Sequence, residues 1–172
     1  FPKYSAAQVM AAFFSYMYAP VLLGFVYQTR MYEQGIYTVW MILISSWGCD
    51  TCAYAVGKLI GRKKIFPVLS PKKSLEGCIG GVLGTALLGW LYGHFFVERF
   101  LPDQGVAGIM AVICAVGAVM SMVGDLAASA VKRNMEIKDY GKLIPGHGGI
   151  MDRFDSMIVT APLTYFLTAL LL

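Results

Sequence analysis

The segment from Lys132 to Ser156 combines the kinds of side chain that bind a phosphate group and a divalent cation. It carries several bases, a glycine-rich turn and two carboxylates three residues apart, directly before an apolar stretch. Glycines let main-chain N–H groups approach a ligand closely, and a helix beginning near Ile150 would offer unpaired N–H donors and a positive dipole end to phosphate. Asp152 and Asp155 would supply the hard oxygen ligands that Mg²⁺ prefers. The segment therefore predicts a magnesium-nucleotide site, although carboxylates at a helix start also stabilise the dipole without a metal.

Two further carboxylates, Asp50 and Asp125, stand inside apolar stretches. An acidic side chain there costs about 2.5–3.5 kcal/mol on insertion scales and usually faces a bundle interior or an aqueous cavity. Each belongs to a series of polar residues at helical spacing, which places the members of a series on one helix face. The two stripes are Ser46, Asp50, Tyr54 and Lys58, and Asp125, Ser129, Lys132 and Arg133. We expect both to reach the same side of a membrane, and simple pairing of helix-end charges is the alternative interpretation.

The elements that carry these residues are predicted to be membrane-spanning helices. Hydrophobic residues make up 58% of the 172-residue chain and charged residues only 14%, with a mean hydropathy of +0.64, whereas a soluble domain is about 25% charged. Stretches of about 20 apolar residues, long enough to cross the hydrocarbon core, recur along the chain. We expect an all-α, polytopic transmembrane helix bundle that forms one catalytic domain over residues 1–172. Its five spans are predicted at 6–27, 36–57, 77–97, 105–131 and 156–172.

The distribution of Lys and Arg predicts the orientation of the bundle. Of these 14 residues, twelve fall at the amino end or in the loops after the second and fourth spans, and two, Arg30 and Arg99, fall in the opposite loops. Because Lys and Arg concentrate in cytoplasmic loops, both long polar loops are expected in the cytoplasm, with the protein in a cell inner membrane or its equivalent. This placement explains the net charge of +4 better than binding to a nucleic acid polymer.

The cysteines and a stripe of small residues are predicted to be structural. Cys49 and Cys52 have C-x-x-C spacing, but Cys78 and Cys114 stand alone in separate apolar segments, and no histidine lies near enough in sequence to complete a familiar zinc pattern. We expect buried, inert thiols. In the third span, small residues at intervals of four form a face that lets neighbouring helices approach closely in lipid. They are Gly77, Gly81, Thr85, Gly89 and Gly93.

Four groups of polar residues follow one another in a specific order. They are Asp50-Thr51-Cys52-Ala53-Tyr54 with Gly57; Ser70-Pro71-Lys72-Lys73-Ser74 with Glu76 and Gly77; Gly124-Asp125-Leu126; and Ser129, Lys132-Arg133, Lys138-Asp139, Pro145-Gly146-His147-Gly148-Gly149, Asp152-Arg153 and Asp155. This pattern resembles that of the phosphatidate cytidylyltransferases, also called CDP-diacylglycerol synthases. Three residues depart from it: Ala128, Cys52 and Ser74 replace an acidic residue, a glycine and a threonine. Members of the family usually carry further spans before the first one here, so we expect this chain to be the C-terminal part of such a protein.

The resemblance implies an enzyme that joins CTP to phosphatidic acid, giving CDP-diacylglycerol and pyrophosphate at the boundary of membrane and cytoplasm. It implies Mg²⁺ as the cofactor, held by Asp125 and Asp152 with Asp155, and leaves a second cation open. Catalytic roles fall on Asp125, Asp152, Lys132, Arg133 and His147; for His147 a hydrogen-bonding role is preferred to proton transfer, since a phosphate nucleophile needs no general base. The substrate-binding residues implied are Asp50, Tyr54, Ser70, Lys72, Lys73, Ser129, Lys138, Asp139, Gly146, Gly148, Gly149 and Arg153.

Two other classes of function remain open from the sequence. A CTP-dependent polyprenol or phytol kinase would use the same two kinds of substrate but would attack the γ-phosphorus with a hydroxyl. A transporter or channel is the alternative without catalysis, because carboxylates in the membrane also mark ion paths; the carboxylates here gather near one interface instead. The oligomeric state is also open, and a homodimer is compatible with the sequence.

Overall fold

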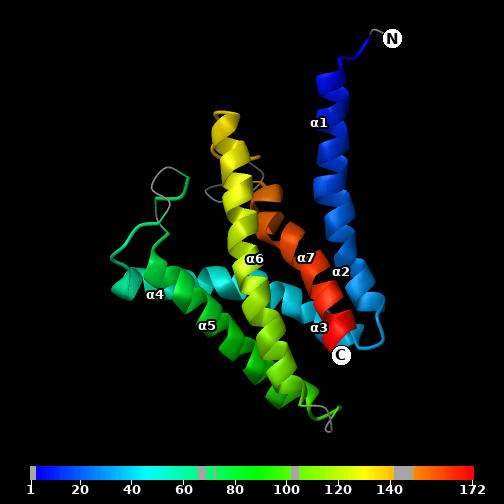
Figure 1. Ribbon diagram of the computed structural model, residues 1–172, viewed down its shortest axis with the longest axis vertical. Helices are drawn as coiled ribbons and strands as arrows, with labels where there is room; N and C mark the ends of the chain where they lie inside the picture. The colour runs from blue at the N-terminus through cyan, green and yellow to red at the C-terminus, as the bar shows by residue number, and fades with distance from the viewer. Residues whose placement is uncertain (1–2, 66–68, 72, 102–104, 142–148) are drawn as a thin grey trace.

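Five helical rods dominate the chain, for which we obtained a computed structural model that describes residues 3–65, 69–71, 73–101, 105–141 and 149–172 (Figure 1). Within these ranges each rod is long and apolar enough to cross a membrane. The rods are Ala6–Met31, Gly35–Ile60, Leu75–Val97, Val106–Asn134 and Met151–Leu171. The predicted all-α bundle of about five transmembrane helices is confirmed.

The first rod changes its helical geometry half-way. Ser5 caps its start, since the Ser5 hydroxyl accepts the Gln8 N–H and the Gln8 side chain accepts the Ser5 N–H, a capping box. Pro20 lacks an N–H and its ring clashes with the carbonyl four residues back, and here the chain forms one wide π-helical turn instead of an α-helical one. The elements of this rod are α1 (Ala6–Tyr16), η1 (Met17–Val21) and α2 (Leu22–Met31).

The remaining rods agree with the predicted spans except at their ends. The last helix begins at Met151, five residues before the predicted 156, and the fourth extends to Asn134 beyond the predicted 131. Charged residues continue both helices because those charges pair with one another, as described below. The elements are α3 (Gly35–Leu43), η2 (Ile44–Gly48) and α4 (Cys49–Ile60); α5 (Leu75–Tyr92) and η3 (Gly93–Val97); α6 (Val106–Asn134); and α7 (Met151–Leu171).

The long helix α6 organises the bundle. Figure 1 shows α6 along the long axis of the molecule with α5 and α7 on either side, and both of these pack against it. The rod formed by α3, η2 and α4 crosses behind α6 in this view, and α2 packs against the far side of α7. The amino-terminal helix α1 has no buried residue. The first rod therefore joins the bundle through its second half only.

The stripe of small residues on α5 is a packing face, as predicted. All five of its members are buried. A β-carbon built at Gly77 would lie 2.9 Å from the Ala53 carbonyl of α4, and one built at Gly89 would lie 2.9 Å from the Met110 carbonyl of α6. These distances leave no room for a side chain. The absence of β-carbons therefore lets α5 fit between α4 and α6.

We expect Gly89→Ala to lower the thermal stability of the detergent-solubilised protein. The new methyl group would press on the Met110 carbonyl and the Cys114 side chain, and overpacking of this kind costs about 1–3 kcal/mol. Gly108→Ala on α6 is the matched control, since a β-carbon there meets nothing within 4 Å and alanine favours a helix by up to about 1 kcal/mol over glycine. Equal melting temperatures for the two variants would contradict the tight contact.

The prediction of buried cysteines is right for two residues and wrong for the other two. Cys49 and Cys114 are buried, while Cys52 and Cys78 are partly exposed, and all four are free thiols. Cys52 packs at the contact of α4 with α5, where a β-carbon at Gly84 would meet its sulfur. Cys78 faces a cavity that opens beside the first turn of α5. Exposure there reflects the shape of the site, which the apolar sequence around Cys78 does not reveal.

Candidate active site

Two lysines and three carboxylates meet at the ends of three helices. The ammonium nitrogen of Lys73, in the segment before α5, lies 2.5 Å from a carboxylate oxygen of Asp125 on α6. Two turns further along α6, Lys132 donates to Asp152 at 3.0 Å and lies 3.6 Å from Asp155, both on α7. The polar stripe on α6 thus provides Asp125 as the negative partner of one ion pair and Lys132 as the positive partner of the next.

The start of α7 is organised by Asp152. One of its carboxylate oxygens accepts the main-chain N–H groups of Gly149 and Tyr140, each at 2.9 Å, while the other accepts the Lys132 ammonium. The sequence predicted unpaired N–H donors at this helix start, ready for phosphate. The Gly149 donor is instead used by Asp152, because an acidic residue in the first turn of a helix can accept the N–H groups that lack helical partners.

The end of α6 is bent back toward α7. The N–H groups of Glu136 and Ile137 donate to the carbonyls of Arg133 and Lys132, the pattern of a Schellman motif. Glu136 takes the left-handed conformation that this motif requires, with φ at 56°, although glycine is the usual residue there. The reversal directs the following residues toward Asp152.

Tyr140 connects the returning segment to both helices. Its hydroxyl donates to the Ala128 carbonyl at 3.3 Å, and its ring lies 5.3 Å from the Lys132 ammonium, in the range of a cation–π contact. Burial raises the pKa of the Tyr140 hydroxyl, so it stays protonated and able to donate. Tyr140 thus holds Lys132 from one side while Asp152 and Asp155 hold it from the other.

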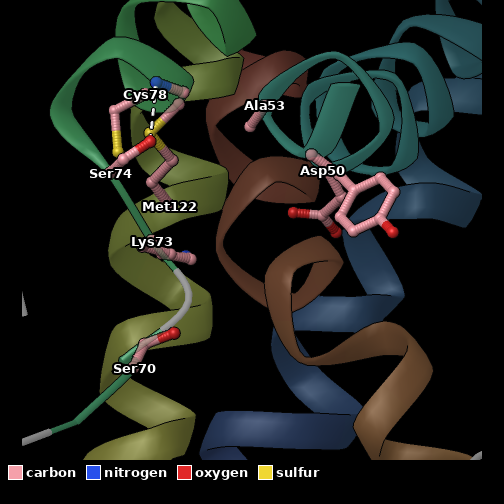
Figure 2. Close-up of a pocket in the computed structure, with 9 residues that line it drawn as sticks. Asp50, Ala53, Ser70, Lys73, Ser74, Cys78 and Met122 are labelled. Atoms are coloured by element: carbon pink, nitrogen blue, oxygen red, sulfur yellow. Dashed lines mark hydrogen bonds between the residues drawn. The ribbon is translucent and has the colours of Figure 1, made fainter. Parts of the chain in front are cut away.

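A cavity of about 200 Å³ opens between α4, α6 and the segment before α5. Figure 2 shows Asp50 on one side of this cavity and Ser70, Lys73 and Ser74 on the other. The Lys73 ammonium is shielded from solvent by its ion pair with the α6 carboxylate. The cavity therefore has opposite charges, Asp50 and Lys73, on its two sides, and it shares Lys73 with the lysine–carboxylate pairs.

The wall that carries Lys73 is held by main-chain pairing. Ser74 caps α5 by accepting the Gly77 N–H, and the Glu76 carboxylate accepts the N–H groups of Arg62 and Lys63. The Leu75 N–H donates to the Lys63 carbonyl at 2.9 Å. These bonds hold the connection after α4 against the first turn of α5. They thereby position Lys73, the residue just before the cap.

Asp50 is connected to the same centre across the bundle. Its carboxylate lies within electrostatic reach of Lys73, Asp125 and Asp155. Ser46, on the same predicted stripe, is fully buried and belongs to the π-helical turn η2, whereas Asp50 is exposed to the cavity.

Two hydrogen bonds connect η2, directly before α4, to the first turns of α7. The hydroxyls of Ser46 and Ser156 lie 2.5 Å apart, and the Trp47 indole donates to the Arg153 carbonyl at 3.2 Å. The first of these bonds is fully buried between the helices. Both bonds determine how closely Asp50 approaches the carboxylates of α7.

The predicted site residues fall into four groups. Those in the ion pairs are Asp125, Lys132, Asp152 and Asp155, and those lining the cavity are Asp50, Tyr54, Ser70 and Lys73. A third group belongs neither to the ion pairs nor to the cavity lining. Its members are the partly buried Ser129, Gly149, which donates to Asp152, and the exposed Arg133, Lys138, Asp139 and Arg153. Four residues lie outside the described part of the chain: Lys72, Gly146, His147 and Gly148.

The carboxylates are the residues that could hold a metal ion. Within the described residues, no three His, Cys, Asp or Glu side chains already converge on one point; Asp125 faces Lys73, and the two α7 carboxylates face Lys132. Mg²⁺ is commonly held by only one or two carboxylates together with substrate phosphates. Carboxylate ligands that are paired with lysines, as here, suit a divalent cation that binds together with a nucleotide.

Several residues that shape this centre escaped the sequence analysis: Trp47, Glu76, Tyr140 and Ser156. In the sequence, Glu76 lies inside one of the four polar groups and Ser156 at the end of a polar segment, and neither position indicates the bond that it makes. For Tyr140 the available signal was an aromatic residue inside an otherwise polar, basic loop. Tyr18, described below, lies outside every motif.

The chain as a whole matches a known group of enzymes. The sequence profile described as "Cytidylyltransferase family" matches residues 2–171. The chain belongs to this family. The helices and the lysine–carboxylate centre described above all lie within the matched region, so the family resemblance drawn from the motifs is confirmed.

Curated relatives of this family member are bacterial proteins named phosphatidate cytidylyltransferase. The protein of Thermotoga maritima is 35% identical over 170 residues, which cover 98% of this chain and 59% of the relative. That of Haemophilus influenzae is 37% identical over 133 residues, 77% of this chain and 46% of the relative. That of Staphylococcus saprophyticus is 34% identical over 154 residues, which cover 89% of this chain and 57% of the relative. The chain thus spans about half the length of the curated relatives it matches.

Proposed function

We propose that the chain carries the catalytic centre of a CTP:phosphatidate cytidylyltransferase, which makes CDP-diacylglycerol and pyrophosphate. The observation that carries the proposal is the meeting of Lys73 and Lys132 with Asp125, Asp152 and Asp155 from three segments far apart in sequence. A nucleotide triphosphate and a lipid phosphate are both anionic, so their reaction needs cations at the point of contact. Lysines paired with carboxylates offer such cations and a place for a metal.

In the proposed reaction, an oxygen of the lipid phosphate attacks the α-phosphorus of CTP. The new oxygen–phosphorus bond forms as the bond to pyrophosphate breaks, and the displaced electron pair leaves with pyrophosphate. Catalysis of such a transfer consists mainly of positioning and charge stabilisation. Lys73, at the cavity, would orient the phosphates of CTP, and Lys132 would bind the phosphate nearest α7. Arg133, Lys138, Arg153 and His147 remain candidates for further phosphate contacts.

Asp125 and Asp152 are proposed to hold Mg²⁺, with Asp155 as a further ligand and Asp50 facing the same space. When bound, the metal would neutralise phosphate charge and align the reacting groups. Until then the lysines would offset the mutual repulsion of the four carboxylates, which lie within electrostatic reach of one another. The arrangement of alternating charges thus suits a site that receives metal and nucleotide together.

The assay that tests the proposal uses purified protein with labelled CTP and phosphatidic acid, with and without Mg²⁺. We expect a CDP-lipid and pyrophosphate in the presence of Mg²⁺ only. A phosphorylated polyprenol or phytol formed from CTP would replace the proposal with the lipid-kinase alternative. Absence of any CTP-dependent product from the full-length protein would refute both.

The orientation of the bundle follows from its charges. We expect cysteines introduced at Lys63 and Lys138, both exposed, to resist an impermeant thiol reagent applied to intact cells, because basic loops stay in the cytoplasm. A cysteine at Glu33, exposed between α2 and α3, should react readily in the same cysteine-free background. Ready labelling at Lys63 or Lys138 from outside would reverse the proposed orientation.

A further inference from the structure

Tyr18 is the first side chain of the amino-terminal rod that turns toward the bundle. Every described residue before it, from Lys3 to Met17, is exposed, while Tyr18 is partly buried. Its hydroxyl is sealed from solvent and has no hydrogen-bond partner among the described residues. Buried hydroxyl groups are nearly always hydrogen-bonded. The Tyr18 hydroxyl therefore needs a hydrogen-bond partner that the described part of the chain does not provide.

The position of this hydroxyl is set by its own rod. Tyr18 lies in the π-helical turn η1, which accommodates Pro20, and its ring stacks on Phe14 with the ring centroids 5.5 Å apart. Short π-helical turns often occur at functional sites. Tyr18 lies in such a turn and is partly buried, whereas Phe14, on which it stacks, is exposed.

Tyr18 approaches the lysine–carboxylate centre on the side away from the cavity. It lies within electrostatic reach of Asp155 and Tyr140, the two residues that flank Lys132. The cavity is lined by residues of α4, of α5 and of the segment before α5, whereas Figure 1 shows the first rod on the far side of α7. The two approaches to the centre are therefore distinct.

The surroundings of Tyr18 indicate which substrate comes from its side. The helix before it exposes large apolar side chains, including Val9, Met10 and Phe13, which are suited to contact with acyl chains. A neutral hydroxyl is a suitable donor to a phosphate oxygen beside Lys132, and it adds no charge that would need burial. A lipid phosphate could thus meet Tyr18 while its acyl chains follow the apolar face of α1.

We propose that Tyr18 is a binding residue for the lipid substrate and donates its hydroxyl to the lipid phosphate at the centre formed by Lys132 and Asp155. The identity of the lipid in this inference rests on the proposed function. Tyr18 would join the binding site from the first rod, which carries none of the motifs. The shared chemistry, a phosphate oxygen, is also present in CTP. The experiment must therefore separate the two substrates.

Binding of dioctanoyl phosphatidic acid and of CTP with Mg²⁺ would be measured separately on the full-length protein in detergent. We expect Tyr18→Phe to raise the dissociation constant for the lipid about 10- to 100-fold, the range for a hydrogen bond to a charged group, and to leave CTP binding unchanged. Tyr16→Phe is the matched control, since Tyr16 lies in the same rod with 59% of its surface exposed. It should leave both affinities unchanged.

Unchanged lipid binding in Tyr18→Phe would overturn the inference, and so would a loss confined to CTP. A parallel loss of both ligands with a lower melting temperature would assign Tyr18 a purely structural role and would also overturn it. The KM for phosphatidic acid should rise with the dissociation constant while the KM for CTP stays constant. A wild-type protein that binds the lipid through Tyr18 but makes no CDP-lipid would refute the proposed function and leave this inference standing.

Discussion

Asp152→Asn is expected to abolish nearly all cytidylyl transfer. The carboxylate accepts three hydrogen bonds, from the Lys132 ammonium and from the N–H groups of Tyr140 and Gly149. Asparagine keeps the volume but loses the charge, and its NH₂ group would face one of these donors. Since one hydrogen bond to a charged group is worth about 1.5–3 kcal/mol, the loss of two or more, together with a proposed metal ligand, should lower the rate at least about a hundredfold.

The measurement is the initial rate of CDP-lipid formation at several Mg²⁺ concentrations, after equal monodisperse yield has been established. Glu33→Gln, at an exposed position in the connection between α2 and α3, removes the same charge far from the centre and should leave the rate unchanged. Asp125→Asn should resemble Asp152→Asn. Near-wild-type rates for Asp152→Asn at limiting Mg²⁺ would exclude Asp152 as a metal ligand.

Lys73→Gln should lower the rate of transfer about 10- to 100-fold. Its ammonium lies at the cavity, 2.5 Å from Asp125 and shielded from solvent, so its removal withdraws a charge-assisted contact to phosphate and leaves a carboxylate without its partner. A contact of this kind is worth about 1.5–3 kcal/mol if it acts in the transition state. The effect should fall on kcat and kcat/KM for CTP, while the bundle remains folded.

Lys63→Gln is the matched control for Lys73→Gln. Lys63 belongs to the same connection but its side chain is exposed, and its main chain is bound to Glu76 and Leu75. We expect a rate within a few fold of wild type, because other bases in the connection maintain the orientation. Equal losses in the two variants would mean that the connection contributes only a diffuse positive field, without a specific phosphate contact from Lys73.

The number of helices, their approximate ends and the packing face of α5 could be predicted from the sequence alone. These features depend on local properties: the length of an apolar stretch, the spacing of small residues, and the cost of charge in lipid. Asp50 and Asp125 could also be singled out, because an acidic residue in an apolar stretch is conspicuous wherever it later packs, and Asp152 and Asp155 stood out because they follow a basic, glycine-rich segment. Helix ends were less predictable, since Lys132 and Asp152 extend their helices only because each provides the other with a partner.

Which charges pair, and which residues position them, was decided only by the tertiary structure. The partner of Lys73 is Asp125 and not its neighbour in a motif, and the link from Ser46 to Ser156 joins residues 110 positions apart. Tyr18 carries no local signal and Tyr140 only that of an aromatic residue in a polar loop, because their roles depend on where a helix end reverses and on what packs beside a π-helical turn. Spacing along one helix specifies a face, whereas a site built from three helices and two connections depends on how those faces pack together.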